Sequence, residues 1–297
     1  MERLPDLPPS PRRRVHPFVN LACFLGTILS TLVAGALMTL DDLSLRTAWD
    51  VLRSPVYWSL GLPYSLSLIL ILGAHEMGHY VACRIYEIDA TLPFFLPAPN
   101  PFGTFGAVIR IRAPFTSRRA LFDIGVAGPI AGFVVAIQIL LYGLSRSRVT
   151  HEPPGAGDIG LPPCLLLEIL FRYFFAVEAD AAVRLDPVFA AAWVGLLATG
   201  LNLLPIGQLD GGHMLYAISR RVHGRVSRIG VVVLVVGGLL VGGWHLVVFG
   251  LLFGFLGLGH PPPLEEQDGL GPGRLVVAGL ALLIFIASFI PVSPQIF

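Results

Sequence analysis

The residues with the clearest chemistry form the string HEMGH at positions 75–79, near the end of an apolar run that begins around Leu66. Four residues advance a helix by just over one turn, so His75 and His79 project from one face with Glu76 beside them. Two imidazoles so placed can bind one zinc ion, which lowers the pKa of a bound water toward about 7 while a nearby carboxylate accepts the proton. The spacing therefore predicts a zinc site on a helix, with Glu76 as the general base.

A catalytic zinc takes three protein ligands, so one more must come from elsewhere in the chain. The best candidate is Asp210, in the string NLLPIGQLDGGH at residues 202–213. The arginine distribution puts this string and residues 75–79 near the same side of a membrane, so their depths agree. The alternatives are residues that could instead end a helix, lie at an interface or form an internal hydrogen bond: Asp123, His213 and His245.

The composition indicates which environment holds these groups. Hydrophobic residues make up 55% of the 297 residues and charged residues only 13%, whereas a soluble domain carries about 25% charged residues. The net charge is +1 and the longest basic run is Arg12–Arg14, so nucleic acid is not an expected partner. The three cysteines form no CxxC pair, which argues against a disulfide framework or a structural zinc knuckle. We therefore expect the protein to lie in a lipid bilayer, with the bilayer as its partner.

The apolar runs predict an all-α polytopic membrane protein with about six spans, because roughly 20 helical residues cross a bilayer core of about 30 Å. The runs are 18–40, 62–83, 120–144, 188–206, 229–258 and 274–291. The run 229–258 contains two Gly-Gly pairs and could form one tilted helix or two shorter ones.

Arginines fall in alternate connections between these runs, which predicts that those connections face the cytoplasm. They are Arg12 to Arg14, then Arg110, Arg112, Arg118 and Arg119, then Arg220, Arg221, Arg225 and Arg228. We therefore expect a bacterial cytoplasmic membrane with the metal site toward the cytoplasmic side. The first run contains Ala34-Gly35-Ala36 and could be a cleaved signal peptide, but its length favours an anchor.

Three ionisable groups within one turn of a spanning helix need compensation, because each charged residue at mid-membrane costs about 2.5 to 3.5 kcal/mol. A bound metal would supply that compensation. The plainer alternative is that His75, Glu76 and His79 only hydrogen-bond to neighbouring helices or lie at the interface. Cys83 continues the same helix face one turn further, and we expect it to pack in the core.

Three strings together resemble the site-2 protease family of intramembrane zinc metalloproteases. These are HEMGH, the small-residue segment GPIAG at 128–132, and the pattern of Asn202, Pro205 and LDG at 209–211, in the order and spacing typical of that family. Residues 92–112 look like the branch known from chloroplasts and cyanobacteria. No insertion large enough for a PDZ domain follows the first catalytic helix.

The resemblance implies a three-helix catalytic core over about residues 62–222, with one zinc ion on His75, His79 and Asp210 and with Glu76 as the base. It also implies that Asn202 binds the substrate backbone or stabilises the oxyanion, the alternative being a purely structural amide. Gly128 and Gly132 form a GxxxG step, which we interpret as a close helix contact.

A short β-hairpin or strand is expected between the second and third spans, where isoleucine and arginine alternate before the next helix. An exposed strand edge can hold a peptide extended by pairing with it. We therefore predict that the following residues bind substrate: Ala107, Val108, Ile109, Arg110, Ile111 and Arg112. A loop held by arginine contacts to lipid phosphates is the alternative.

The sequence as a whole predicts a zinc-dependent intramembrane metalloendopeptidase that acts on single-span membrane proteins. Two alternatives remain: another HExxH membrane zinc protease with a different third ligand, and a non-catalytic pseudoprotease or scaffold. The expected organisation is a disordered tail at 1–17, a first span and external loop at 18–61, the protease core at 62–222 including an external segment at 145–187, and C-terminal spans at 223–297.

Overall fold

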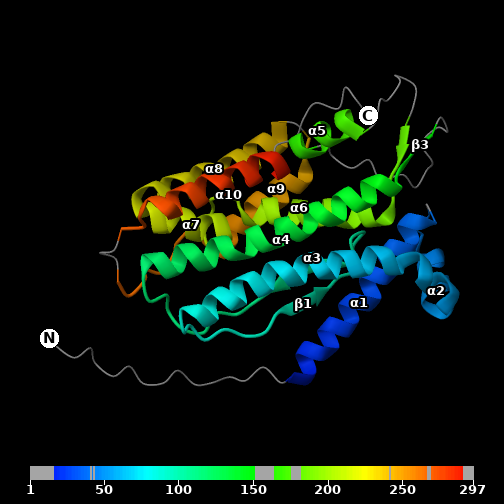
Figure 1. The fold of residues 1–297 in the computed structure, drawn as a ribbon, viewed down its shortest axis with the longest axis horizontal. Helices are drawn as coiled ribbons and strands as arrows, with labels where there is room; N and C mark the ends of the chain where they lie inside the picture. Colours follow the sequence, from blue (N-terminus) through cyan, green and yellow to red (C-terminus); the bar gives the residue numbers. More distant parts are fainter. Residues whose placement is uncertain are drawn as a thin grey trace.

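The computed structural model describes residues 17–40, 42, 44–150, 164–174, 182–240, 242–265 and 269–289, which form a bundle of helices with two small two-stranded sheets (Figure 1). The predicted tail lies outside the described residues, apart from Pro17. The helices are α1 (Pro17–Thr39), α2 (Leu45–Arg53), the 3₁₀ turn η1 (Pro55–Tyr57), α3 (Trp58–Ile85), α4 (Arg118–Arg146), α5 (Leu165–Phe174), α6 (Pro187–Asn202), α7 (Asp210–Ile218), α8 (Arg220–Leu240), α9 (Trp244–Leu256) and α10 (Pro272–Phe289). The strands are β1 (Phe94–Pro97), β2 (Thr104–Val108), β3 (Arg148–Thr150) and β4 (Ala182–Arg184).

Within the described chain, five helices are long and apolar enough to cross a bilayer: α1, η1 continued by α3, α4, α8 and α10. The chain is therefore an integral membrane protein with several spans. The predicted span 188–206 corresponds to α6, which has only 16 residues and is about 24 Å long at 1.5 Å per residue. It ends at Asn202 because the chain turns through Pro205 and Gly207, and Gly207 has a φ of +54°.

The apolar run 229–258 forms two helices, α8 and α9, joined by a tight turn. Gly242 adopts a φ of +71°, and the N–H of Gly243 donates to the carbonyl of Gly238 at 2.8 Å. A Cβ on Gly238 would lie 2.9 Å from the Gly243 carbonyl oxygen and 2.9 Å from the backbone nitrogen of Val247 in α9, so the glycine permits the close approach of the two helices. The Gly-Gly pairs in the sequence mark this turn.

The predicted hairpin between the second and third spans is present, but its second strand starts earlier than the alternating residues indicated. Strands β1 and β2 pair antiparallel, with Phe94 opposite Val108 and Pro97 opposite Thr104. Regular pairing in β2 stops at Val108, and an isolated bridge from Ala90 to Ile111 extends the contact. The alternation of isoleucine and arginine indicates which side chains face inward. It does not indicate where pairing with the neighbouring strand begins.

The turn of this hairpin packs deep against the spans and not only at their ends. Ser30, in the middle of α1, donates its hydroxyl to the carbonyl of Gly103 at 2.6 Å, and the Tyr64 hydroxyl of α3 donates to the carbonyl of Phe102 at 3.1 Å. Gly103 has a φ of +78°, and a Cβ there would lie 2.5 Å from the Ser30 carbonyl oxygen. In Figure 1 the hairpin lies beside α3 and α1.

A second two-stranded sheet, in which β3 after α4 pairs antiparallel with β4 before α6, was not predicted from the sequence; helix α5 lies between its two strands in the chain. Arg148 pairs with Arg184 and Thr150 with Ala182. Below it, a Cβ on Gly143 of α4 would lie 2.4 Å from the backbone nitrogen of Phe189 in α6. This close contact holds α4 and α6 side by side. Of the predicted external segment, residues 151–163 and 175–181 lie outside the described part.

Two clusters of buried apolar side chains follow α3 and α4, and the predicted metal ligands on α3 lie between them. The first cluster includes Leu68, Ile71 and Leu72 of α3 with Ala136, Leu140 and Leu144 of α4. The second includes Ala82 and Cys83 of α3 with Ala120, Leu121 and Phe122 of α4. Cys83 is therefore a core residue. Residues 75–79 lie between the two clusters, so the bundle encloses the polar groups within apolar packing.

Candidate metal centre

The two histidines of the HExxH string lie one turn apart on α3 and point to the same place. His75, Glu76 and His79 are 4%, 6% and 6% exposed, so all three are buried in the bundle. The imidazole Nε2 atoms of His75 and His79 are 3.2 Å apart. Helical spacing alone produces this arrangement, as the sequence predicted.

Asp210, the first residue of α7, completes the group from a distant part of the chain. Its Oδ2 atom lies 3.1 Å from His75 Nε2 and 3.3 Å from His79 Nε2. Ligands about 2.05 Å from a tetrahedral zinc ion lie about 3.3 Å from one another. The three separations of 3.1, 3.2 and 3.3 Å therefore match the donor set that zinc prefers. These residues form a possible metal-binding group.

The hydrogen bond of His79 selects the tautomer that a metal requires. Its Nδ1 atom lies 2.7 Å from the backbone carbonyl oxygen of Ile124 in α4. A carbonyl oxygen only accepts, so Nδ1 carries the proton and the lone pair of Nε2 points toward His75 and Asp210. Helix α4 thus fixes both the orientation and the protonation of a ligand on α3.

Glycines at close contacts place Asp210 at the start of α7. A Cβ on Gly211 would lie 2.0 Å from the carbonyl oxygen of Leu203, and a Cβ on Gly212 would lie 2.4 Å from that of Gly207. Because glycine has no side chain, the turn between α6 and α7 can pack closely against the start of α7. This packing brings Asp210 to the depth of His75 and His79 in the bundle.

Gly128 and Gly132 of α4 do more than allow two helices to approach. A Cβ on Gly128 would lie 2.1 Å from His79 Nε2, and a Cβ on Gly132 would lie 3.1 Å from His75 Nδ1. Each glycine therefore leaves the space that one imidazole occupies. Sequence reasoning identified this pair as a packing step; the matching interval of four residues in HExxH and in GxxxG was the signal that could have linked them.

Replacing Gly128 with Ala should displace the His79 ring, because the new methyl group would overlap Nε2. We expect zinc affinity to fall by about 10- to 100-fold, the range found when the group that positions a metal ligand is disturbed. Zinc per chain and the zinc concentration that half-fills the site are the measurements. Gly279→Ala in α10 is the matched control, since no atom lies within 4 Å of its Cβ position. Unchanged zinc content in the Gly128 variant would contradict this role.

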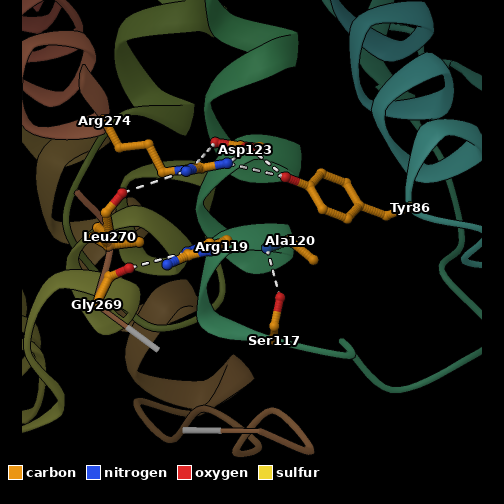
Figure 2. A network of polar contacts seen from close by, with 8 residues as sticks. All are labelled: Tyr86, Ser117, Arg119, Ala120, Asp123, Gly269, Leu270 and Arg274. Carbon is orange, nitrogen blue, oxygen red and sulfur yellow. Dashed lines mark hydrogen bonds and ion pairs between the residues drawn. The ribbon is translucent and has the colours of Figure 1, made fainter. Parts of the chain in front are cut away.

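Two of the three alternative third ligands are held elsewhere. Asp123 accepts two hydrogen bonds from the Arg274 guanidinium, at 2.8 and 2.7 Å, and Tyr86 also donates to it (Figure 2). His213 Nδ1 lies 2.5 Å from His260 Nε2, and burial lowers the pKa of His213 to about 3, so its ring is neutral. The side chain of His245 lies outside the described residues.

Figure 2 shows what the Asp123 network does. The carboxylate on α4 joins Tyr86, just after α3, to Arg274 in the first turn of α10, and Arg119 Nε donates to the Gly269 carbonyl at 3.0 Å. A bidentate pair of this kind fixes geometry as well as contributing energy. Asp123 therefore docks α10 on the core, a role the sequence did not reveal.

Asn202, the last residue of α6, lies at the edge of the metal-binding group. Its Nδ2 atom is 3.3 Å from His75 Nε2. The Asn202 amide therefore places a hydrogen-bond donor next to the metal-binding group. The structure thus brings Asn202 together with His75, His79 and Asp210.

The predicted substrate-binding residues lie beside Glu76. The backbone of Ile109 lies near the Glu76 carboxylate. Along this segment exposure alternates: Val108, Arg110 and Arg112 are exposed, whereas Ala107, Ile109 and Ile111 are partly buried. One edge of the segment is occupied by the preceding chain, since Thr91 N donates to the Arg110 carbonyl at 3.0 Å and Arg112 N donates to the Asp89 carbonyl at 2.8 Å.

Comparison with known proteins gives one family. Residues 63–241 match the sequence profile of peptidase family M50. The chain is 31% identical over 238 residues to the probable chloroplast zinc metalloprotease EGY2 of Arabidopsis thaliana, covering 75% of this chain and 40% of that protein. It is 30% identical over 250 residues to the probable chloroplast zinc metalloprotease EGY1 of the same plant, covering 79% and 44%.

The chain thus spans less than half the length of these curated relatives. A solved structure, the site-2 protease from Methanocaldococcus jannaschii, aligns with a TM-score of 0.39 and 18% identity, covering 82% of this chain and 93% of that one.

Proposed function

Because the chain belongs to peptidase family M50, the site-2 protease family, we propose that it is an intramembrane zinc metalloendopeptidase that cleaves membrane proteins in or beside their transmembrane segments. The observation that carries this proposal is the convergence of His75, His79 and Asp210, with donor separations of 3.1 to 3.3 Å. These groups come from two helices 131 or more residues apart in the chain. Their position between two apolar clusters supports catalysis within the bundle.

One zinc ion per chain would be held by Nε2 of both histidines and by the Asp210 carboxylate. When bound, zinc lowers the pKa of water and polarises a carbonyl group. The alternative HExxH protease with a different third ligand is disfavoured by the partners of Asp123 and His213. His79 is kept as the Nδ1–H tautomer by Ile124, and the two α4 glycines leave the rings room to point at the site.

Glu76 would act as the general base and then as the general acid. It would take a proton from the attacking water and later deliver it to the nitrogen of the leaving amine, so that the peptide bond breaks with no net change in the enzyme. Its buried position, 6% exposed, protects the proton transfer from bulk water. Asn202 would donate its amide N–H to the carbonyl oxygen of the scissile bond as negative charge develops there.

Residues 107–112 would hold the substrate in an extended conformation next to Glu76. A transmembrane helix must unwind before its peptide bonds reach a carboxylate, and pairing with a strand edge replaces the backbone hydrogen bonds that are lost. The proximity of Ile109 to Glu76 supports this placement because it puts the segment beside the proposed base. The class of substrate would be single-span membrane proteins.

Replacing Ile109 with Pro should abolish cleavage while zinc content stays normal, because proline removes a backbone N–H and constrains the strand. Ile109→Val is the conservative control and should keep most of the activity. The measurement is the rate of cleavage of a single-span substrate alongside zinc per chain. Normal cleavage by the proline variant would count against substrate pairing on this segment.

The site would open toward the cytoplasmic side of a bacterial cytoplasmic membrane. This orientation is supported by the arginines of 110–119 and 220–228, which lie before α4 and in the first turns of α4 and α8. Basic residues near spans stay on the cytoplasmic side. Water would reach the buried group from that side.

The proposed activity is tested with purified protein in lipid vesicles that also contain a single-span substrate. We expect one or a few specific products, complete inhibition by a zinc chelator, and recovery when zinc is restored. The substrate can be identified by comparing membrane proteomes of cells that express the wild type or Glu76→Gln, because a true substrate accumulates only with the variant. If a wide panel of single-span proteins stays intact while the protein holds zinc, the chain is a pseudoprotease.

A further inference from the structure

A cavity of about 290 Å³ lies away from the metal centre, where four segments of the chain meet. These are the start of α4, the end of α7, the start of α8 and the loop that precedes α10. The residues that line it are Arg118, Tyr216, Ile218, Ser219, Arg220, Arg221 and Pro263. Three of these seven described residues carry a guanidinium group and none is acidic. The cavity is thus suited to an anion.

Arg118 is held in place before any ligand arrives. Its Nε donates to the Ala217 carbonyl at 2.9 Å, and its Nη2 donates to the Ile218 carbonyl at 2.8 Å. These bonds satisfy the last carbonyl groups of α7, and none of them uses Nη1. The two N–H groups of Nη1 can therefore donate to an anion without loss of the existing contacts.

Helix α8 adds a second source of positive potential. It has 21 residues and begins at Arg220, directly after Ser219. The backbone N–H of Val222 donates to the Ser219 hydroxyl oxygen at 3.4 Å, so this hydroxyl lies over the first turn of the helix. The amino end of a long helix carries partial positive charge, which supplements Arg220 and Arg221.

The position of the cavity in the bundle points to a lipid and not to a soluble anion. Two of the five candidate spans, α4 and α8, begin at its rim, at Arg118 and Arg220. The cavity therefore lies at the level where helices enter the bilayer, which is the level of phospholipid phosphates.

An exposed apolar strip on α8 starts at Val222, next to the cavity-lining Arg221, and runs along the helix away from the cavity. Its members are exposed and lie within about 60° of one another around the helix, because they are spaced by seven, four, three and four residues. They are Val222, Ile229, Val233, Val236 and Leu240. Such a strip can hold an acyl chain whose headgroup occupies the cavity.

We propose that the cavity formed by Arg118, Ser219, Arg220 and Arg221 binds the phosphate of an anionic phospholipid, whose acyl chains lie along α8. The guanidinium groups match phosphate oxygens in geometry and charge. A zwitterionic headgroup would bring its own cation against the arginines and bind less well. The site is separate from the metal centre and does not depend on the proposed protease activity.

The test measures binding of dioctanoyl phosphatidylglycerol, dioctanoyl phosphatidylcholine and inorganic phosphate to the purified full chain in a neutral detergent. The double variant Arg220→Gln/Arg221→Gln should bind phosphatidylglycerol about thirtyfold more weakly, at roughly fivefold per arginine near a membrane surface. Arg228→Gln, on the same helix but outside the cavity, should change binding by less than about twofold. Normal zinc content in each variant shows that the fold is intact.

Three results would overturn the proposal. Unchanged binding of phosphatidylglycerol by the double variant would remove the cavity as the site. An equal loss in Arg228→Gln would mean that only the general positive field attracts lipid. Inorganic phosphate that binds as tightly as the lipid would identify the ligand as a soluble anion.

Discussion

Replacing Glu76 with Gln should lower the rate of peptide hydrolysis by about a thousandfold, within the range typical of general acid–base catalysis. Glutamine has nearly the same shape as glutamate and lies on the same buried face of α3, but it cannot accept the proton of the attacking water. The loss should fall on kcat and much less on KM, because the proton transfer belongs to the transition state. The rate is followed with a single-span substrate in vesicles.

Zinc content is the second readout for this variant, since Glu76 is outside the group formed by His75, His79 and Asp210. We expect about one zinc per chain in both wild type and variant. Met77→Leu on the adjacent, 40% exposed position is a control that should leave the rate unchanged. If Glu76→Gln cleaves as fast as the wild type, the proteolytic mechanism must use a different base.

Replacing Asp210 with Ala should remove most of the zinc and all measurable cleavage. Loss of a residue that only orients a zinc ligand already lowers affinity by about 10- to 100-fold, so loss of a ligand itself should exceed about a hundredfold. Without the Asp210 carboxylate, His75 and His79 would be the two remaining members of the three-residue group. The measurements are zinc per chain after dialysis and the zinc concentration that restores activity.

Asp123→Ala is the matched control for this experiment. Asp123 is also a carboxylate in the membrane-embedded region, but it is paired with Arg274 and lies outside the metal-binding group (Figure 2). The control should retain zinc, although it should loosen the docking of α10. Loss of zinc in the Asp123 variant with retention in the Asp210 variant would reverse the ligand assignment.

The sequence predicts the elements of this site that depend on local geometry. The i, i+4 spacing of His75 and His79 is sufficient to stack them, because the helical period does not depend on the surrounding fold. Span lengths follow in the same way from the bilayer thickness, and four of the six predicted spans match helices long and apolar enough to cross. The fifth, 229–258, contains parts of α8 and α9, with the break at the glycines that the sequence displays.

Only the tertiary structure could show which distant residues meet. Asp123, His213 and Asp210 were all chemically reasonable third ligands, and they are distinguished by the partners that packing gives them. The role of Gly128 likewise needed the structure to be established, since a missing Cβ acquires meaning only when an imidazole from α3 occupies its place. The sequence determined a helical membrane protein with two imidazoles on one helix face, because those properties arise from neighbours along the chain. The packing of α3, α4 and α7 decided that Asp210 joins the two histidines. Contacts across more than a hundred residues depend on how whole helices fit together.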